Sequence, residues 1–155
     1  MRIVHGIRVV WWRYRKPRLA GCRVVALDGD GRVLLIRHRI RHSYGSRAWM
    51  LPGGGLRRGE DPLGAAAREL AEEAGCGLIA PVLVAEVPEV LHGAGNRVHV
   101  VVGRTADVAR PDRREATHAA FFAPDALPAD TARGLAAAIP RWITAATAAG
   151  PPRPE

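Results

Sequence analysis

The chain contains 155 residues, with 23 basic and 15 acidic side chains and a formal net charge of +8. This length suits one domain with a single core, and no stretch reaches the roughly 20 apolar residues of a membrane span. The basic residues are nearly all arginine, no basic run of five or more occurs, and no series of aromatic side chains is available to stack bases. We therefore interpret the charge as a basic surface that favours phosphorylated substrates over nucleic acid.

Cys22 and Cys76 form neither a metal-binding spacing nor a disulfide framework. We interpret both as core residues in a reducing compartment. No signal-peptide pattern is visible in the first residues. The expected location is therefore cytoplasmic.

The first 20 residues differ from the rest, because apolar side chains recur there at helical spacing. The apolar set comprises Ile3, Ile7, Val10, Trp11 and Tyr14. We expect residues 1–20 to form an amphipathic arm that precedes the main domain at residues 21–148. The favoured role is packing on the domain's own apolar surface, and the alternatives are a homodimer contact or an anionic lipid surface.

A β-hairpin is predicted next. Residues 22–27 and 32–37 are rich in β-branched and aliphatic side chains, and they flank the turn sequence Asp-Gly-Asp-Gly at residues 28–31.

A helix is predicted after a glycine-rich loop. Asp61 is a suitable N-cap, Pro62 suits the first helical position, and Gly75 is a typical stop signal. At about 100° per residue, two sets of side chains gather on different sides of this helix. The apolar set is Leu63, Ala67, Leu70 and Ala74, and the acidic set is Glu69, Glu72 and Glu73.

The acidic side of this helix predicts a bound cation. Carboxylates on one face repel one another and raise each other's pKa values, and a divalent cation is their natural partner. Arg68 stands four residues before Glu72, so we expect it to give structural support to that carboxylate and to leave Glu69 and Glu73 free for metal. The alternative is a solvated surface, which we disfavour because the three glutamates share only this one arginine.

The remainder of the chain continues the alternation of strands and helices. We expect strands at residues 81–87, 97–105 and 117–122, a turn at residues 92–96, a helix at residues 131–148, and a disordered tail at residues 149–155. Pro140 should kink or split the last helix. Its core-facing residues should be Leu135, Ala138, Ile139, Trp142 and Ile143.

The run from Gly54 to Cys76 resembles the signature of the Nudix hydrolases, Gly-x5-Glu-x7-Arg-Glu-(apolar)-x-Glu-Glu-x-Gly-(apolar). The matching residues are Gly54, Glu60, Arg68, Glu69, Leu70, Glu72, Glu73 and Gly75. Cys76 departs from the larger aliphatic residue usual at the last position, and a buried cysteine behaves there as a small hydrophobe. Residues 49–55 and 121–128 also resemble family segments, so the likeness covers most of residues 20–145.

This resemblance implies an α/β/α sandwich, with a mixed β-sheet between helices, in which carboxylates hold Mg²⁺ or Mn²⁺ against a pyrophosphate. Water then attacks phosphorus in a nucleoside diphosphate linked to another moiety, such as a nucleoside triphosphate, a dinucleotide or a nucleotide sugar. A second hypothesis is the same chemistry on a 5′-triphosphorylated RNA end. A third is a non-catalytic nucleotide-binding module, which lost glutamates would indicate.

The resemblance also implies roles for single residues. Glu72 and Glu73 are the expected metal ligands, and Glu69 is either a third ligand or the base that deprotonates the attacking water. Glu60 binds an additional cation or orders the loop. A backbone carbonyl of the loop, for which we choose Gly54, should complete the coordination.

One further base is sought outside the signature. Glu115 is our first candidate, and Glu86 and Glu89 are the alternatives. The competing interpretation makes Glu115 a solvated charge beside the arginines at residues 113–114.

Substrate contacts are expected from the segment before the glycine-rich loop. Arg37, His38, Arg39 and Arg41 follow the hairpin, and one or two of them are candidates to bind a terminal phosphate. Trp49 either stacks on a base or belongs to the core.

Overall fold

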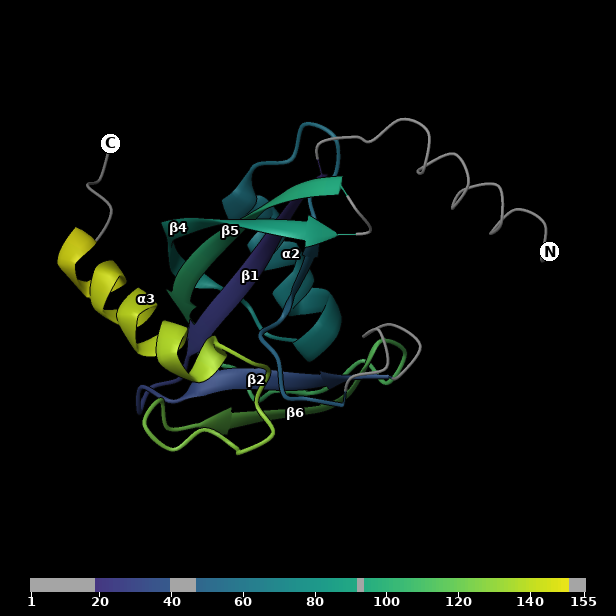
Figure 1. Cartoon of the computed structure of the whole chain (residues 1–155). Helices are drawn as coiled ribbons and strands as arrows, with labels where there is room; N and C mark the ends of the chain where they lie inside the picture. The colour runs from purple at the N-terminus through teal and green to yellow at the C-terminus, as the bar shows by residue number, and fades with distance from the viewer. Residues whose placement is uncertain (1–18, 40–46, 92–93, 151–155) are drawn as a thin grey trace.

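We describe the protein from a computed structural model, which describes residues 19–39, 47–91 and 94–150. In these ranges the elements follow the order β1 (Leu19–Leu27), β2 (Val33–His38), β3 (Gly53–Gly55), α2 (Pro62–Ala74), β4 (Ile79–Leu91), β5 (Ala94–Arg104), β6 (Ala116–Phe122) and α3 (Leu135–Ala149). A six-stranded mixed sheet in the order β4-β5-β1-β2-β6, with β3 beside β1, separates α2 from α3 (Figure 1). The expected α/β sandwich is confirmed.

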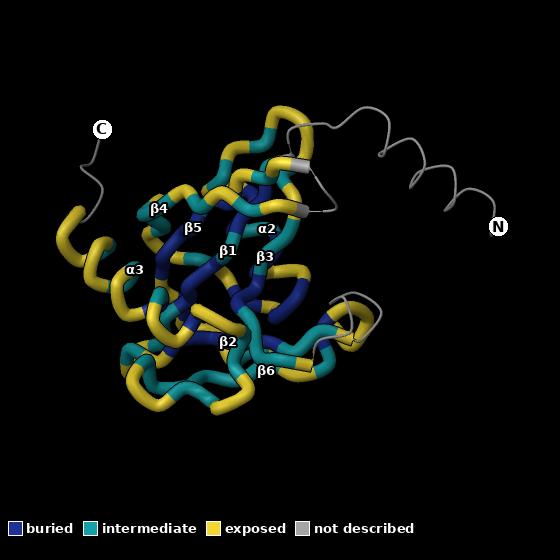
Figure 2. The backbone as a smooth tube through the Cα atoms, viewed as in Figure 1, coloured by how far each residue is buried: buried dark blue, intermediate teal, exposed yellow. Residues whose placement is uncertain are grey.

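Strand β1 lies at the centre, and its alternating side chains divide the core into two clusters. Cys22, Val24 and Ala26 pack with α2, whereas Val25 packs with α3. Figure 2 shows the buried residues concentrated along these central strands. Each helix therefore covers its own hydrophobic cluster, one on each face of the sheet.

The predicted hairpin is confirmed, but its strands soon separate. Strands β1 and β2 are antiparallel and pair at Leu27 and Val33, where the Asp28 carboxylate accepts two backbone N–H bonds in the turn. Farther along, residues 50–55 run between the two strands, since Val24 N–H donates to the Pro52 carbonyl and residues 36 and 50 form a bridge. The short strand β3 is thereby placed beside β1.

Strands β4 and β5 confirm the next two predicted strands and extend both of them. They form an antiparallel pair from Ile79 opposite Arg104 to Leu91 opposite Ala94, and β5 also pairs in parallel with β1. The predicted turn at residues 92–96 is therefore too long, because the ladder of β5 already begins at Ala94. Strand β6 confirms the prediction at residues 117–122.

Helix α2 has the predicted ends but a different buried face. Asp61 accepts the N–H of Gly64, Pro62 follows it, and Gly75 ends the helix in the left-handed conformation with φ of 65°. Leu63 is 36% exposed rather than packed, and Ala67 is only half-buried. The buried residues are Ala65, Ala66, Glu69, Leu70, Glu73 and Ala74. The face of α2 that contacts the sheet therefore differs from the predicted one and includes Glu69 and Glu73. The small alanine side chains on this face allow the helix to approach the sheet closely.

Helix α3 begins later than predicted and continues through its proline. Thr131 forms a bridge with Trp49, and the helix starts only after Gly134, whose φ is 84°. Pro140 is exposed and does not split the helix. Proline has no N–H to donate to the carbonyl four residues earlier, and this loss costs less where water can bind that carbonyl. Leu135 and Ile139 are buried as expected. Trp142 and Ile143 pack against the same cluster, of which Ala138 is not a member.

Several expectations lie outside the described residues. They include the arm, apart from Leu19 and Ala20, together with Arg41 and the tail beyond Gly150. The proposed domain boundaries and the homodimer contact therefore stay predictions. Within the described ranges, no helix has the length and apolar character needed to cross a membrane.

Candidate active site

Helix α2 places two glutamates against the sheet and one at its rim. Glu69 and Glu73 are only 8% and 2% exposed, whereas the side chain of Glu72 is 51% exposed. All three were predicted to share one acidic side. The structure instead makes two of them part of the helix–sheet interface, with Glu72 in solvent beside them.

The glycine strand β3 receives the two buried carboxylates. The Gly53 N–H donates to Oε2 of Glu73 at 3.0 Å. A Cβ atom added at Gly54 would lie 2.5 Å from Oε1 of Glu69, so any other residue there would push the carboxylate away. Gly54 therefore lets the buried carboxylate of Glu69 approach the backbone closely.

Arg68 is the organising cation of the loop. Its Nε and Nη2 donate to the two oxygens of Glu60 at 2.7 and 2.9 Å, and Nη1 donates to Oε1 of Glu69 at 2.7 Å. The expected contact with Glu72 is present but longer, at 3.4 Å. Arg57 contacts Glu72 as well, at 3.3 Å. Arg68 thus supports Glu60 and Glu69 more closely than Glu72, and Glu69 has one oxygen already engaged.

Glu60 closes the loop before the helix. Besides Arg68, it accepts the backbone N–H of Arg57 at 2.8 Å. These hydrogen bonds, that of Arg68 above all, lower the pKa of Glu60 to about 2. Of its two predicted roles, this geometry favours ordering the loop.

The buried carboxyls of Glu73 and Glu69 both resist ionisation. Burial raises the pKa of Glu73 to about 8, against the opposing hydrogen bond from Gly53 and with the added repulsion of Glu69 and Glu115. Burial also raises the pKa of Glu69, and Arg68 opposes that rise. A cation bound beside them would favour the ionised form of both carboxyls.

The loop at residues 112–116 brings the predicted extra carboxylate to the same place. The Asp112 N–H donates to the Glu73 carbonyl at 3.3 Å, and the charge of Glu115 is one of the lesser causes that raise the pKa values of Glu69 and Glu73. No ion pair joins Glu115 to the arginines at residues 113–114 in the part of the chain that the structure describes. Glu86 and Glu89 lie instead on β4 and pair with other residues.

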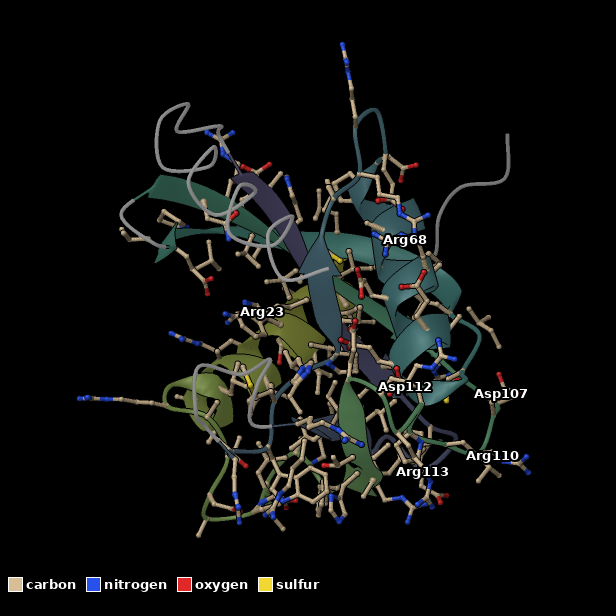
Figure 3. All side chains as sticks on the ribbon, turned by 90° about the vertical axis from the view of Figure 1, so that its right-hand side faces the viewer. Arg23, Arg68, Asp107, Arg110, Asp112 and Arg113 are labelled. Carbon is tan, nitrogen blue, oxygen red and sulfur yellow. The ribbon has the colours of Figure 1, made fainter. Side chains whose placement is uncertain are left out.

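Asp112 was not among the predicted residues, yet it shapes this loop. One of its oxygens accepts the backbone N–H groups of Arg114, Glu115 and Ala116 at 2.9 to 3.0 Å. Although burial opposes it, these bonds hold the pKa of Asp112 below its usual value. Figure 3 shows Asp112 and Arg113 beside α2, which carries Arg68. An aspartate followed by several polar residues was the available sequence signal for such a turn.

The predicted substrate-binding residues separate into two groups. His38 lies with its Nε2 3.9 Å from Oε1 of Glu73, and Arg39 donates its backbone N–H to the Glu115 carbonyl at 2.8 Å. Both therefore border the carboxylates. Arg37 instead pairs with Asp130 and lies over the ring of Trp49, 4.6 Å from its centroid.

Trp49 is partly buried and packs against the hydrophobic cluster beneath α3. Its ring meets that of Phe122 edge to face, with the ring centroids 5.0 Å apart. Of its two predicted roles, the structure favours a core residue that also supports Arg37.

The carboxylates fit a hard divalent cation by their chemistry. In the described part of the chain, no three His, Cys, Asp or Glu side chains are already gathered into a cation site. The available donors are carboxylate oxygens, the ligands that Mg²⁺ and Mn²⁺ prefer, and two of them are buried with raised pKa values. A cation would relieve their repulsion and draw Glu69, Glu72 and Glu73 together.

Comparisons with known proteins agree with this geometry. A family described as NUDIX domain matches residues 17–143. An RNA pyrophosphohydrolase of Bartonella bacilliformis is 42% identical over 63 residues, which are 38% of this chain and 37% of that protein. An ADP-ribose pyrophosphatase of Mycobacterium tuberculosis is 47% identical over 53 residues, 34% of this chain and 25% of that protein. The alignments thus span well under half the length of these curated relatives.

The fold comparison extends over more of the chain. The crystal structure of a MutT NUDIX hydrolase from Burkholderia pseudomallei superposes with a TM-score of 0.68 and 26% identity. It covers 79% of this chain and 95% of the other. A MutT protein from Methanosarcina mazei has a TM-score of 0.66 at 21% identity, covering 82% and 96% of the two chains, which shows the shared fold.

Proposed function

Since the chain belongs to the NUDIX domain family, we propose that it hydrolyses the pyrophosphate bond of a nucleotide-derived substrate with the help of Mg²⁺ or Mn²⁺. The substrate class is a nucleoside diphosphate linked to another moiety, such as a nucleoside triphosphate, a dinucleotide or a nucleotide sugar. The observation that carries the proposal is the burial of Glu69 and Glu73 against the glycine backbone of β3.

We assign the cation to Glu69, Glu72 and Glu73, with the Gly54 carbonyl as an additional ligand. Bound there, Mg²⁺ or Mn²⁺ would neutralise phosphate oxygens, polarise phosphorus and lower the pKa of water. Glu60 holds the loop through Arg68 and is the ligand we assign last, because both of its oxygens already accept hydrogen bonds.

The chain's own carboxylates also supply the base. Glu115 is exposed and lies on a separate loop. It can therefore accept a proton while the three glutamates of α2 hold the cation. Glu69 is the alternative base, since only one of its oxygens is held by Arg68. As the base takes the proton of the attacking water, the water oxygen bonds to phosphorus and the P–O bond to the leaving phosphate ester breaks.

The phosphate chain is best met by His38 and Arg39. His38 lies beside Glu73. The exposed guanidinium of Arg39 donates to the Arg113 carbonyl at 2.7 Å, which holds it near the loop at residues 112–116. Arg37 is committed to Asp130 and Trp49, so we assign it to supporting the end of β2. Nucleotide substrates and the two free cysteines suit action in the cytoplasm.

RNA carrying a 5′-triphosphate is the second candidate substrate. The named relative from Bartonella bacilliformis and the net charge of +8 favour it. A non-catalytic module is disfavoured, because every glutamate of the signature is present and two are buried at the expected place.

The test is an assay of phosphate and pyrophosphate release across nucleoside triphosphates, dinucleotides, nucleotide sugars and 5′-triphosphorylated RNA. We expect release from at least one of them with Mg²⁺ or Mn²⁺ and none with EDTA. Release only from RNA would select the second candidate. No release from any member of the panel would overturn the proposal.

A further inference from the structure

The segment just before β6 is held from two sides, although most of it is exposed. We call residues 112–116 the base loop, because they carry Glu115. On the helix side, the Asp112 N–H donates to the carbonyl of Glu73 in α2 at 3.3 Å. On the strand side, the N–H of Arg39, which follows β2, donates to the Glu115 carbonyl at 2.8 Å. The base loop therefore connects the catalytic helix to the end of β2.

The carboxylate of Asp112 organises the base loop from within. One of its oxygens accepts the backbone N–H groups of Arg114, Glu115 and Ala116 at 2.9 to 3.0 Å. Arg113 has a φ of 61°, and its N–H donates to the Ala116 carbonyl at 2.9 Å. A side chain with a Cβ atom rarely adopts this left-handed conformation, so surrounding bonds must hold it. Three of those bonds end on one oxygen of Asp112.

The position of the Glu115 side chain depends on this backbone. Glu115 is exposed, so no packing around the side chain fixes it. A general base must nevertheless lie within hydrogen-bond reach of the water that it deprotonates, and small displacements lower the rate steeply. Exposed loops are ordinarily mobile, which would remove a base from its place for much of the time. The bonds to Asp112 restrain the base loop where packing does not.

We propose that Asp112 is a positioning residue, whose carboxylate fixes the base loop and thereby holds Glu115 beside the glutamates of α2. Asp112 acts as an acceptor of backbone N–H groups and does not itself touch the substrate. The inference rests on the proposed function, to which it adds the residue that orients the base.

A purely electrostatic role is the competing explanation. The charge of Asp112 is one of the lesser causes that raise the pKa of Glu73, so its loss could also act on the carboxylates directly. Two conservative variants separate the explanations. Asp112→Asn keeps a side-chain oxygen at the same place without the charge, and asparagine forms the same kind of turn. Asp112→Glu keeps the charge but carries the carboxylate one methylene farther from the three N–H groups.

Steady-state kinetics on a hydrolysed substrate measure the effect of these variants. We expect Asp112→Ala and Asp112→Glu to lower kcat about tenfold or more and to change KM less than about twofold, because only the reacting step loses its base. Asp112→Asn should keep kcat within about threefold of the parent value. Loss of activity in Asp112→Asn together with parental activity in Asp112→Glu would overturn the inference.

A double-mutant cycle tests whether Asp112 acts through Glu115. Glu115→Gln removes the base, so Asp112 then has no base to position. We expect Asp112→Ala to lower kcat less than about twofold further in the Glu115→Gln background. Equal losses in the two backgrounds would overturn the inference. A parental kcat in Glu115→Gln would overturn it as well, since the base would then lie elsewhere.

The turn between β1 and β2 offers a matched control. One oxygen of Asp28 accepts the N–H groups of Asp30 and Arg32 at 2.9 Å each, at the end of β2 that lies farther from the base loop. Asp28→Ala should lower the free energy of unfolding as the loss of such a turn does, and it should leave kcat unchanged. An equal loss of kcat per folded molecule in Asp28→Ala would show that a general loss of order, rather than the position of Glu115, explains the effect.

Hydrogen exchange of the backbone amides gives a readout that needs no turnover. Measured by NMR, the amides of residues 114–116 should exchange faster in Asp112→Ala and Asp112→Glu than in the parent chain and Asp112→Asn. Unchanged exchange in folded Asp112→Ala would overturn the inference, because the base loop would then be ordered without this carboxylate.

The two proposals fail in different ways. An active parent chain in which Asp112→Ala keeps the parental kcat would overturn the positioning role and keep the proposed function. A parent chain that hydrolyses no member of the substrate panel would overturn the proposed function, and the positioning role would fall with it.

Discussion

The helices α2 and α3 cover opposite faces of one sheet, and they bury different kinds of side chain. Helix α3 buries Leu135 and Ile139, as an ordinary amphipathic helix does. Helix α2 buries alanines and Leu70 together with the carboxylates of Glu69 and Glu73. Apolar burial under α3 stabilises the fold, whereas burial of acid under α2 opposes it. One helix is therefore expected to govern stability and the other activity.

The largest effect is expected from Glu73→Gln in α2. The substitution keeps the shape of the side chain and its bond from Gly53 but removes the charge that we assign to the cation. We expect the turnover number to fall at least about 100-fold while the fold is kept. Steady-state release of phosphate and thermal unfolding would measure the two quantities. An undiminished rate would contradict the metal role of Glu73.

A change in α3 should lower stability and leave turnover unchanged, the reverse of the effect expected for Glu73→Gln. Ile139 is fully buried, so Ile139→Ala would leave a cavity and lower the free energy of unfolding by about 2–5 kcal/mol. Turnover per folded molecule should not change, because the cluster beneath α3 does not include the carboxylates. Urea unfolding followed by an assay under folding conditions would check both. A loss of turnover in the folded variant would show that the two faces are coupled.

The pH dependence of stability should reveal the buried acids of α2. Glutamate ionises near pH 4.5 when unfolded, but Glu73 in the folded chain has a pKa of about 8. Between these values the folded state holds a proton that the unfolded state has lost, so stability falls as pH rises. We expect a fall of up to about 3 kcal/mol between pH 4.5 and pH 7 in EDTA, measured by urea unfolding.

Two further groups set the limits of this window. The pKa values of Glu60 and Asp112 are lowered on folding, so their stabilising contributions are lost only as pH falls below about 4. Glu73→Gln should flatten the decline above pH 4.5, and Mg²⁺ should offset it in the parent chain. The same slope in Glu73→Gln would show that another group causes it.

Local chemistry explains what the sequence predicts well. Asp61, Pro62 and Gly75 each act through the backbone of α2 itself, so its ends were predictable from residue type alone. The turn at residues 28–31 is likewise a local feature. In contrast, α3 begins late because Thr131 pairs with the distant Trp49, which no local signal shows.

The sequence predicted which residues form the site better than it predicted the contacts between them. The spacing located Glu69, Glu72 and Glu73 on one helix, but helical geometry alone did not show that two of them face the sheet. Arg68 bonds Glu60 most closely because the loop folds back over the helix, a tertiary event that the four-residue spacing to Glu72 obscures. The roles of these residues stay predictions until the variants are measured.

The parallel pairing of β1 with β5 has a consequence for synthesis of the chain. Val24 and its partner Val101 are far apart in sequence, with β2, β3, α2 and β4 between them. Such non-local contacts form slowly, because closing the long intervening loop loses conformational entropy before the strands gain any stabilising contact. On the ribosome, α2 emerges before the sheet that receives it is complete. Catalytic competence is therefore expected to appear late, and it would serve as a direct readout of completed folding.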